Sequence, residues 1–241
     1  MRPSAKRRLH LVQTFAATAG ALLMATVITL LPSPARAGDE ALPTEDAFAK
    51  SVLAVIATYP TDGTHGYYWP KGDAWPGTTC DFDYLGTKVC EADAKKRCYC
   101  CGITFEVFVK AWKAWSDSRK VEFRVPGVSG KEMIGLRADW FGSTGDTRRT
   151  LQHAVTARKL GRAIDKLEDA RPGDFVQLWR RSGTGHSVIF IELKRNSEGK
   201  PKALKYWSSQ KSTNGIGYRE ESLEGKEGVD PEQTYVVRVG R

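Results

Sequence analysis

The sequence predicts an α+β domain in which a helix packs on a small antiparallel sheet. Apolar side chains recur at three- and four-residue spacing over residues 103–115, the pattern of a helix with one broad apolar face. Residues 175–180, 186–193 and 203–208 have strand composition, and polar or glycine-containing turns separate them. We therefore expect a helical and loop-rich part to about residue 170, followed by a sheet over residues 171–241.

The N-terminal segment predicts a signal peptide over residues 1–37. Four basic residues precede an apolar run over residues 15–31, and the small-residue pattern Ala35-Arg36-Ala37 follows it. A retained transmembrane anchor is the alternative, but the run is short for a membrane span. We expect residues 38–241 to form a single domain that is secreted or periplasmic, with no stable membrane insertion after signal cleavage.

Much of the positive charge belongs to the predicted signal peptide. Removing residues 1–37 takes away five basic residues and no acidic one, so the formal net charge falls from +9 to +4. The remaining basic residues are spread out, with no lysine- or arginine-rich block interleaved with aromatic residues. This argues against nucleic acid as a partner and is compatible with an anionic polymer such as the cell wall.

Shorter elements flank the main helix on both sides. A helix is predicted over residues 47–57, with Thr44 or Asp46 as its N-cap. Alternation predicts a short strand over residues 121–125, and residues 234–239 predict a closing strand.

A second helical pattern covers residues 151–160 and contains His153. A lone histidine on a helix is usually structural or merely exposed, so we assign His153 no catalytic role. The chain contains no internal repeat that would indicate a second domain.

The stretch Cys98-Tyr99-Cys100-Cys101 opens the main helix. A thiol in the first turn meets unpaired backbone N–H groups and the positive end of the helix dipole, which favour thiolate and suit a nucleophile. The alternative is that the cysteines are disulfide partners, as is common in exported proteins. Bonds from Cys80 and Cys90 would then hold an irregular loop over residues 71–96 in place. Five cysteines leave at least one thiol unpaired in a monomer, which a catalytic cysteine would explain.

His186 begins a segment that is apolar on both faces, which predicts a buried central strand. A glycine-rich turn precedes it, so its side chain can reach a cleft. If the next hairpin has its apex near residues 197–198, the cross-strand neighbour of His186 is Ser208, Ser209 or Gln210. A one-residue slip changes the face, so the pattern leaves the register open. A polar oxygen at this place would orient the imidazole.

The order of the candidate residues along the chain resembles that of papain-like enzymes: first a cysteine, then a histidine at a strand start, then a polar residue on the next strand. The motifs are closer still to the NlpC-type and CHAP cell-wall peptidases and amidases. The Gly-Thr-x-Tyr-x-Trp segment of those families resembles residues 63–69, and their Cys-Ser-Gly-aliphatic turn resembles residues 100–103. Their Pro-Gly-Asp strand and Gly-His-x-aliphatic motif are similar to residues 172–174 and 185–188. The resemblance implies a papain-like fold and hydrolysis of peptide or amide bonds in peptidoglycan, with no cofactor.

The resemblance also implies roles for individual residues. In NlpC-type enzymes the third catalytic position is usually a histidine, whereas this chain offers Gln210, which resembles the papain-type amide best, and then Ser208. Tyr99 stands where an aspartate often precedes the nucleophile. The other implied site residues are the nucleophile Cys100, the general base and acid His186, and the substrate or oxyanion residues Tyr68 and Cys101.

We expect Cys100 rather than Cys101 to be the free nucleophile. Aligning Gly102-Ile103 with the family's turn puts the reactive thiol two residues before the glycine. Helix geometry then turns Cys101 roughly 100° away around the axis, toward packing. The remaining cysteines make an even set that predicts two disulfides, with three pairings open: Cys80, Cys90, Cys98 and Cys101.

Three classes of function compete at this point. The first is a secreted thiol hydrolase acting on peptide or amide bonds, most plausibly in peptidoglycan. The second is a noncatalytic wall-binding or structural domain of the same fold, whose mark would be Cys100 in a disulfide. The third is a structural zinc site at the cysteine stretch, against which export and the crowded spacing argue.

Overall fold

The structure is a computed structural model that describes residues 41–70, 77–145 and 147–241. The predicted signal peptide lies outside these residues. Within the described ranges, none of the helices combines the length and apolar character that crossing a bilayer would require.

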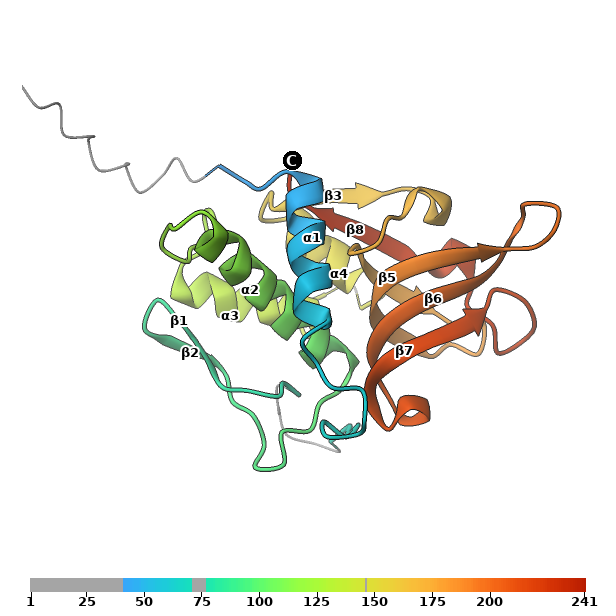
Figure 1. Cartoon of the computed structure of the whole chain (residues 1–241), viewed down its shortest axis with the longest axis horizontal. Coiled ribbons are helices and arrows are strands. Elements are labelled where there is room, and N and C mark those ends of the chain that lie inside the picture. Colours follow the sequence, from blue (N-terminus) through green and yellow to red (C-terminus); the bar gives the residue numbers. More distant parts are fainter. Residues whose placement is uncertain (1–40, 71–76, 146) are drawn as a thin grey trace, which may run out of the picture. The chain divides into compact units, whose positions relative to one another are not determined.

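The described residues fold into helices and antiparallel strands, which confirms the α+β class (Figure 1). The α-helices are α1 (Glu45–Ile56), α2 (Cys100–Ser118), α3 (Gly130–Trp140) and α4 (Thr150–Thr156). The strands are β1 (Phe82–Tyr84), β2 (Thr87–Cys90), β3 (Gly161–Ile164), β4 (Phe175–Trp179), β5 (Gly185–Arg195), β6 (Pro201–Gln210), β7 (Gly215–Ser222) and β8 (Tyr235–Val239). Three short 3-10 helices are η1 (Leu167–Asp169), η2 (Lys211–Thr213) and η3 (Pro231–Gln233).

Six strands form one sheet in the order β3-β8-β4-β5-β6-β7, and every neighbouring pair is antiparallel. Strands β5 and β6 form the predicted hairpin, in which Asn196 N donates to the Lys200 carbonyl at 2.9 Å. The predicted closing strand is β8, which lies between β3 and β4. Strands β1 and β2 form a separate two-stranded hairpin.

The apolar core lies on both faces of the large sheet. Ile189 and Trp207 belong to a cluster that includes the buried sides of α1, α2 and α4. Their neighbours in sequence, Val188 and Tyr206, belong to a second cluster built mainly from the strands. This alternation follows from the two-residue period of a strand and explains why β5 is apolar on both faces. Figure 1 shows α2 and α3 on one side of the view and β5, β6 and β7 on the other.

The α1 helix matches its prediction, and its cap is Thr44, whose Oγ1 accepts from Ala47 N at 3.2 Å. The predicted strand over residues 121–125 is wrong, because the segment pairs with no strand of the described chain. Val125 N instead donates to the Tyr84 hydroxyl at 2.8 Å. Alternation of residue types forms a strand only where a partner edge is present.

Helix α3 was not predicted, although the sequence carries its start signal. Ser129 and Glu132 form a capping box: Ser129 N donates to Glu132 Oε2 at 2.6 Å, and Glu132 N donates to Ser129 Oγ at 3.3 Å. Part of the loop expected over residues 71–96 is the β1–β2 hairpin, turned by Leu85 and Gly86, whose φ values are 48° and 75°. Both residues adopt the positive φ that a tight hairpin turn requires.

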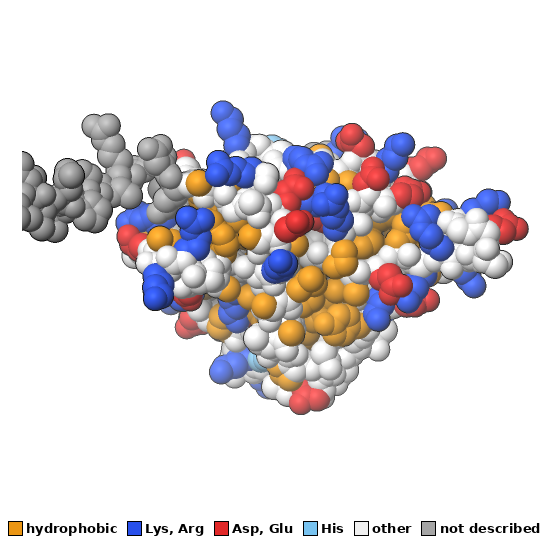
Figure 2. All heavy atoms as spheres, turned by 45° about the horizontal axis from the view of Figure 1, so that its top comes forward, with side chains coloured by type: hydrophobic (Ala, Val, Ile, Leu, Met, Phe, Trp, Pro, Cys, Tyr) orange, Lys and Arg blue, Asp and Glu red, His pale blue; other side chains and the backbone are white. Residues whose placement is uncertain are grey.

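Charges of both signs mix on the surface. On the face drawn in Figure 2, lysine and arginine side chains lie among aspartate and glutamate side chains, with apolar side chains between them. This distribution fits the modest net charge expected for residues 38–241 and gives this face no single-sign block.

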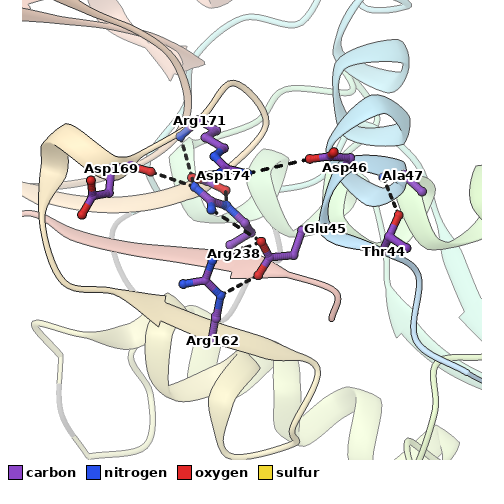
Figure 3. Close-up of polar contacts among 9 residues, drawn as sticks. All are labelled: Thr44, Glu45, Asp46, Ala47, Arg162, Asp169, Arg171, Asp174 and Arg238. Carbon is purple, nitrogen blue, oxygen red and sulfur yellow. Dashed lines mark hydrogen bonds and ion pairs between the residues drawn. The ribbon is translucent and has the colours of Figure 1, made fainter.

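A buried ionic network ties α1 to the sheet (Figure 3). Arg238 on β8 donates from Nε and Nη2 to the two carboxylate oxygens of Asp174, each at 2.8 Å, and the two side chains are 5% and 2% exposed. Arg238 Nη1 also lies 3.5 Å from Glu45 Oε2 at the start of α1, and Glu45 pairs with Arg162 on β3. The Asp of the Pro-Gly-Asp motif therefore has a structural role.

Replacing Asp174 with alanine should lower the free energy of unfolding by about 3 kcal/mol, because Arg238 would keep a buried charge without its main partner. Asp46→Ala is the matched control, since its carboxylate is 81% exposed and lies 3.9 Å from Arg171. That change should stay within about 0.5 kcal/mol of the wild type. Denaturant unfolding measures both, and equal effects would contradict the structural role of Asp174.

Candidate active site

Cys100 begins helix α2 and is 8% exposed. The residue before it, Tyr99, has an extended backbone and provides no side-chain cap for the helix. Hydrogen bonds to the neighbouring segment fix the approach of the chain: Tyr68 N donates to the Cys98 carbonyl at 3.0 Å, and Cys98 N donates to the Gly66 carbonyl at 3.1 Å. The Cys100 thiol therefore lies at a helix N-terminus that no capping side chain covers, which favours negative charge.

His186 lies at the start of β5 and contacts Gln210 at the end of β6. Its Nε2 is 2.9 Å from Gln210 Oε1, and both residues are 6% exposed. Gln210 Nε2 donates to Thr213 Oγ1 at 3.1 Å, which turns the amide oxygen toward the imidazole. An amide oxygen only accepts, so this network assigns a proton to Nε2 and leaves Nδ1 as the nitrogen that can serve a thiol.

The surroundings of Cys100 stabilise its thiolate. A hydrogen bond from the Cys101 thiol, the charge and hydrogen bond of His186 and the Ser187 backbone N–H hold the pKa of Cys100 well below its usual range, against the effect of burial. The shared hydrogen bond and burial raise the pKa of Cys101 well above its usual range. The two adjacent thiols therefore differ: the surroundings favour the thiolate of Cys100 and the thiol of Cys101.

A cleft of about 750 Å³ opens over these groups. Its lining includes Cys100, Cys101, His186 and Gln210, so the structure brings the candidate catalytic residues together. The cleft is within the size range of ordinary small-molecule and peptide sites. Aromatic side chains from several loops and strands also line it: Tyr67, Trp69, Trp140, Phe141 and Trp179.

Of the three candidates for the third position, Gln210 contacts the imidazole. The β5–β6 register pairs Ile189 with Trp207, and continuing it three residues along each strand sets Gln210 opposite His186. Ser208 Oγ instead donates to the Ser187 carbonyl at 2.7 Å, and Ser209 Oγ donates to the Cys98 carbonyl at 3.3 Å. Both serines are fully buried and do not contact the imidazole through these bonds.

The expectation that Tyr68 lies in the cleft is wrong, and Tyr67 takes that place. Tyr67 forms a β-bridge with Cys98, so successive side chains of this segment point to opposite sides. Tyr67 and Trp69 line the cleft, whereas the ring of Tyr68 lies 3.7 Å from the guanidinium carbon of Arg97. The sequence held this information, because the family's Tyr-x-Trp spacing ending at Trp69 selects Tyr67.

Cys101 lies at the cleft, as the family resemblance implied, whereas the packing position and the disulfide expected for it are wrong. Cys101 lines the same cleft as Cys100 instead of turning toward packing. Side chains on a helix tilt toward its N-terminus, so in the first turn both thiols point past the helix end despite the rotation between them. All five cysteines are free thiols, so the predicted disulfides are not formed. Other groups bind these sulfurs: the Cys80 thiol donates to Glu106 Oε1 at 3.3 Å.

Several lining residues were missed by the sequence reasoning. Gln177 on β4 accepts from Ser187 Oγ at 2.7 Å and from Thr150 Oγ1 at 3.2 Å, which fixes the strand beside His186. A buried amide in an otherwise apolar strand was the available signal. No sequence pattern around Lys211 and Arg219 indicated a site. Lys211 reaches the cleft because it follows the end of β6, and Arg219 reaches it because β7 pairs with β6. His153 lies on α4 with its side chain 53% exposed and does not line the cleft.

Comparisons with models of known protein families, with curated proteins and with solved structures find no match for this chain.

The Cys101 thiol can be tested as a determinant of Cys100 ionisation. Cys101→Ala removes the hydrogen bond to the Cys100 sulfur, so the pKa of Cys100 should rise toward its usual range. The pH profile of Cys100 alkylation by iodoacetamide, mapped by mass spectrometry, should shift to higher pH, because only the thiolate reacts. Cys101→Ser keeps a donor and should shift the profile less. A profile that is the same in the wild type and Cys101→Ala would contradict this role.

Proposed function

We propose that the chain is a secreted, papain-like cysteine hydrolase of the NlpC or CHAP type that cleaves peptide or amide bonds, with peptidoglycan as its substrate. The observation that carries the proposal is a thiol at a helix start that hydrogen-bonds an imidazole, which an amide oxygen in turn orients. These are the parts of a thiol nucleophile, its general base and a positioning residue. The motif order along the chain supports the same assignment.

In the proposed reaction the Cys100 thiolate attacks the carbonyl carbon of the scissile amide. The negative charge that develops on the carbonyl oxygen is held by backbone N–H groups at the start of α2 and by the Tyr67 hydroxyl. Burial and the nearby cysteine charges raise the pKa of Tyr67 to about 12, so its hydroxyl stays a proton donor at neutral pH. These donors act on charge that forms in the transition state, which is where they accelerate the reaction.

The thiol proton of Cys100 passes to His186 when the thiolate forms. Protonated His186 then donates this proton to the leaving amine, and the carbon–nitrogen bond breaks to leave a thioester on Cys100. A water molecule, deprotonated by neutral His186, attacks the thioester carbonyl and releases the carboxylic acid with the thiolate. Gln210 holds the imidazole ring through both steps by accepting from Nε2. Both steps use protein groups and water alone.

A noncatalytic wall-binding domain was the competing interpretation, and its mark would have been Cys100 in a disulfide. Cys100 is a free thiol that lines the cleft.

Cys100→Ala and His186→Ala should each lower product release from purified peptidoglycan by at least about 10³-fold, because each removes a group that reacts. Chromatography and mass spectrometry of the soluble fragments measure the release and identify the cleaved bond. Lys202→Gln, an exposed change on β6 outside the cleft, is the control and should release the wild-type products. Wild-type release by Cys100→Ala would exclude the proposed mechanism.

Gln210→Ala should reduce kcat by about 10- to 100-fold without abolishing turnover, because the residue positions the imidazole and does not react. Tyr67→Phe should reduce kcat to a similar extent by removing one oxyanion donor. Tyr68→Phe is the matched control and should retain the wild-type rate. If Tyr68→Phe is impaired and Tyr67→Phe is not, the assignment of the cleft tyrosine is reversed.

A further inference from the structure

Apart from the Cys100 thiolate, the charged side chains that line the cleft are basic. Apart from His186, the ionisable side chains of basic type in the lining are Arg180, Lys211 and Arg219, and no aspartate or glutamate lines the cleft among the described residues. This differs from the face in Figure 2, where both signs are mixed. A cleft walled by one sign of charge concentrates ligands of the opposite sign.

The carboxylate of Glu221 pairs with two of these cations, Arg180 and Arg219. Arg180 donates to both of its oxygens, with Nη2 at 2.9 Å from Oε2, and the Tyr206 hydroxyl donates to Oε2 at 2.8 Å. Arg219 Nε is only 3.9 Å from the same oxygen, which is an ion pair without a hydrogen bond. Lys211 forms no ion pair with a carboxylate of the described chain. Arg180 and Arg219 therefore share one carboxylate, and Lys211 adds a positive charge without a carboxylate partner among the described residues.

The excess positive charge lies next to the general base. Lys211 directly follows Gln210, the partner of the imidazole. Arg219 on β7 is paired in register with Tyr206, whose ring centroid is 5.7 Å from that of His186. Arg219 Nη1 donates to Ser212 Oγ at 2.9 Å, which holds the guanidinium at this end of the cleft. Aromatic side chains from elsewhere, such as Trp69 and Phe141, line the rest.

We propose that Lys211 and Arg219 form a subsite for a carboxylate of the substrate, so that the enzyme selects amide bonds in acidic peptides with an anionic group near the scissile bond. The inference rests on the proposed hydrolase function, because it assigns a substrate feature to that same cleft. A guanidinium and an ammonium that line one cleft provide hydrogen-bond donors and charge that match a carboxylate.

Two alkylating reagents of nearly equal shape test the subsite without any knowledge of the substrate. Iodoacetate carries a carboxylate and iodoacetamide carries the neutral amide, and both react with the Cys100 thiolate. The ratio of their rate constants cancels changes in thiolate fraction and reports the charge that surrounds the reagent. Lys211→Gln/Arg219→Gln should lower the iodoacetate-to-iodoacetamide ratio about tenfold, and raising the salt concentration should lower the wild-type ratio.

Lys202→Gln is the matched control, because it removes one lysine charge outside the cleft and should keep the wild-type ratio. Lys211→Gln alone changes an exposed side chain and gives a second readout if the double variant fails to fold. Peptide mapping confirms that the label is on Cys100. The same ratio in the wild type and in Lys211→Gln/Arg219→Gln, or in Lys211→Gln where only that variant folds, would overturn the carboxylate subsite.

The alkylation ratio does not depend on turnover, so the two proposals fail separately. A protein that cleaves no amide but shows the charge-dependent ratio retains the carboxylate subsite and loses the hydrolase function. Where peptides are cleaved, those with glutamate next to the scissile bond should be preferred about tenfold over their glutamine isosteres. That preference should disappear in Lys211→Gln/Arg219→Gln and persist in Lys202→Gln, and its persistence in the double variant would overturn the inference.

Discussion

The burial of helix α2 is the constraint on which the rest of the structure depends. Fourteen of its 19 residues are buried, so its position is fixed by contacts on nearly every side, and Cys100 at its first residue is fixed with it. The burial includes the Glu106 carboxylate, which accepts from the Tyr59 hydroxyl at 2.7 Å and from Thr79 N and Lys110 Nζ, each at 2.6 Å. Burial opposes ionisation, but Lys110 and these hydrogen bonds lower the pKa of Glu106. The carboxylate thereby anchors two loops to the helix.

The helix and the sheet of the α+β class could be predicted from residue periodicity, because α2, the β5–β6 hairpin and β8 each bury a continuous apolar pattern. The elements that were missed depend on tertiary partners. Strand β7 pairs with β6 along its length, although glycine and charged residues dilute its strand composition. Residues 121–125 are the opposite case: their pattern is strand-like, but the segment pairs with no strand of the described chain. The hydrophobic pattern is therefore enough to predict the long elements, whereas the formation of the other strands depends on pairing with a neighbouring strand.

Cys100, His186 and Gln210 could be chosen as candidate site residues from the sequence because each lies at the end of a predictable helix or strand. The length of the hairpin then gave the residues on the second strand that lie opposite His186. The predicted cleft tyrosine was Tyr68, one position from Tyr67, which lines the cleft. On an extended segment, a shift of one residue moves the side chain to the opposite face. The packing orientation predicted for Cys101 was wrong for another reason. A helical wheel describes the middle of a helix, whereas side chains in the first turn tilt past the helix end. The Pro-Gly-Asp motif has a structural role, because Asp174 accepts a hydrogen bond from Arg238 and does not line the cleft.

The ionisation of Cys100 can be followed directly through the ultraviolet absorbance of its thiolate. Burial raises the pKa of Cys80 to about 11 and those of Cys90 and Cys98 to about 12, and the pKa of Cys101 is also raised, so we assign a thiolate that forms near neutral pH to Cys100. We expect a wild-type signal well below the ordinary thiol pKa of about 8.5, and this signal should be absent in Cys100→Ala and shift to higher pH in His186→Ala. A wild-type signal that appears only at or above that pKa, or that is unchanged in His186→Ala, would show that His186 and the helix start do not stabilise a Cys100 thiolate.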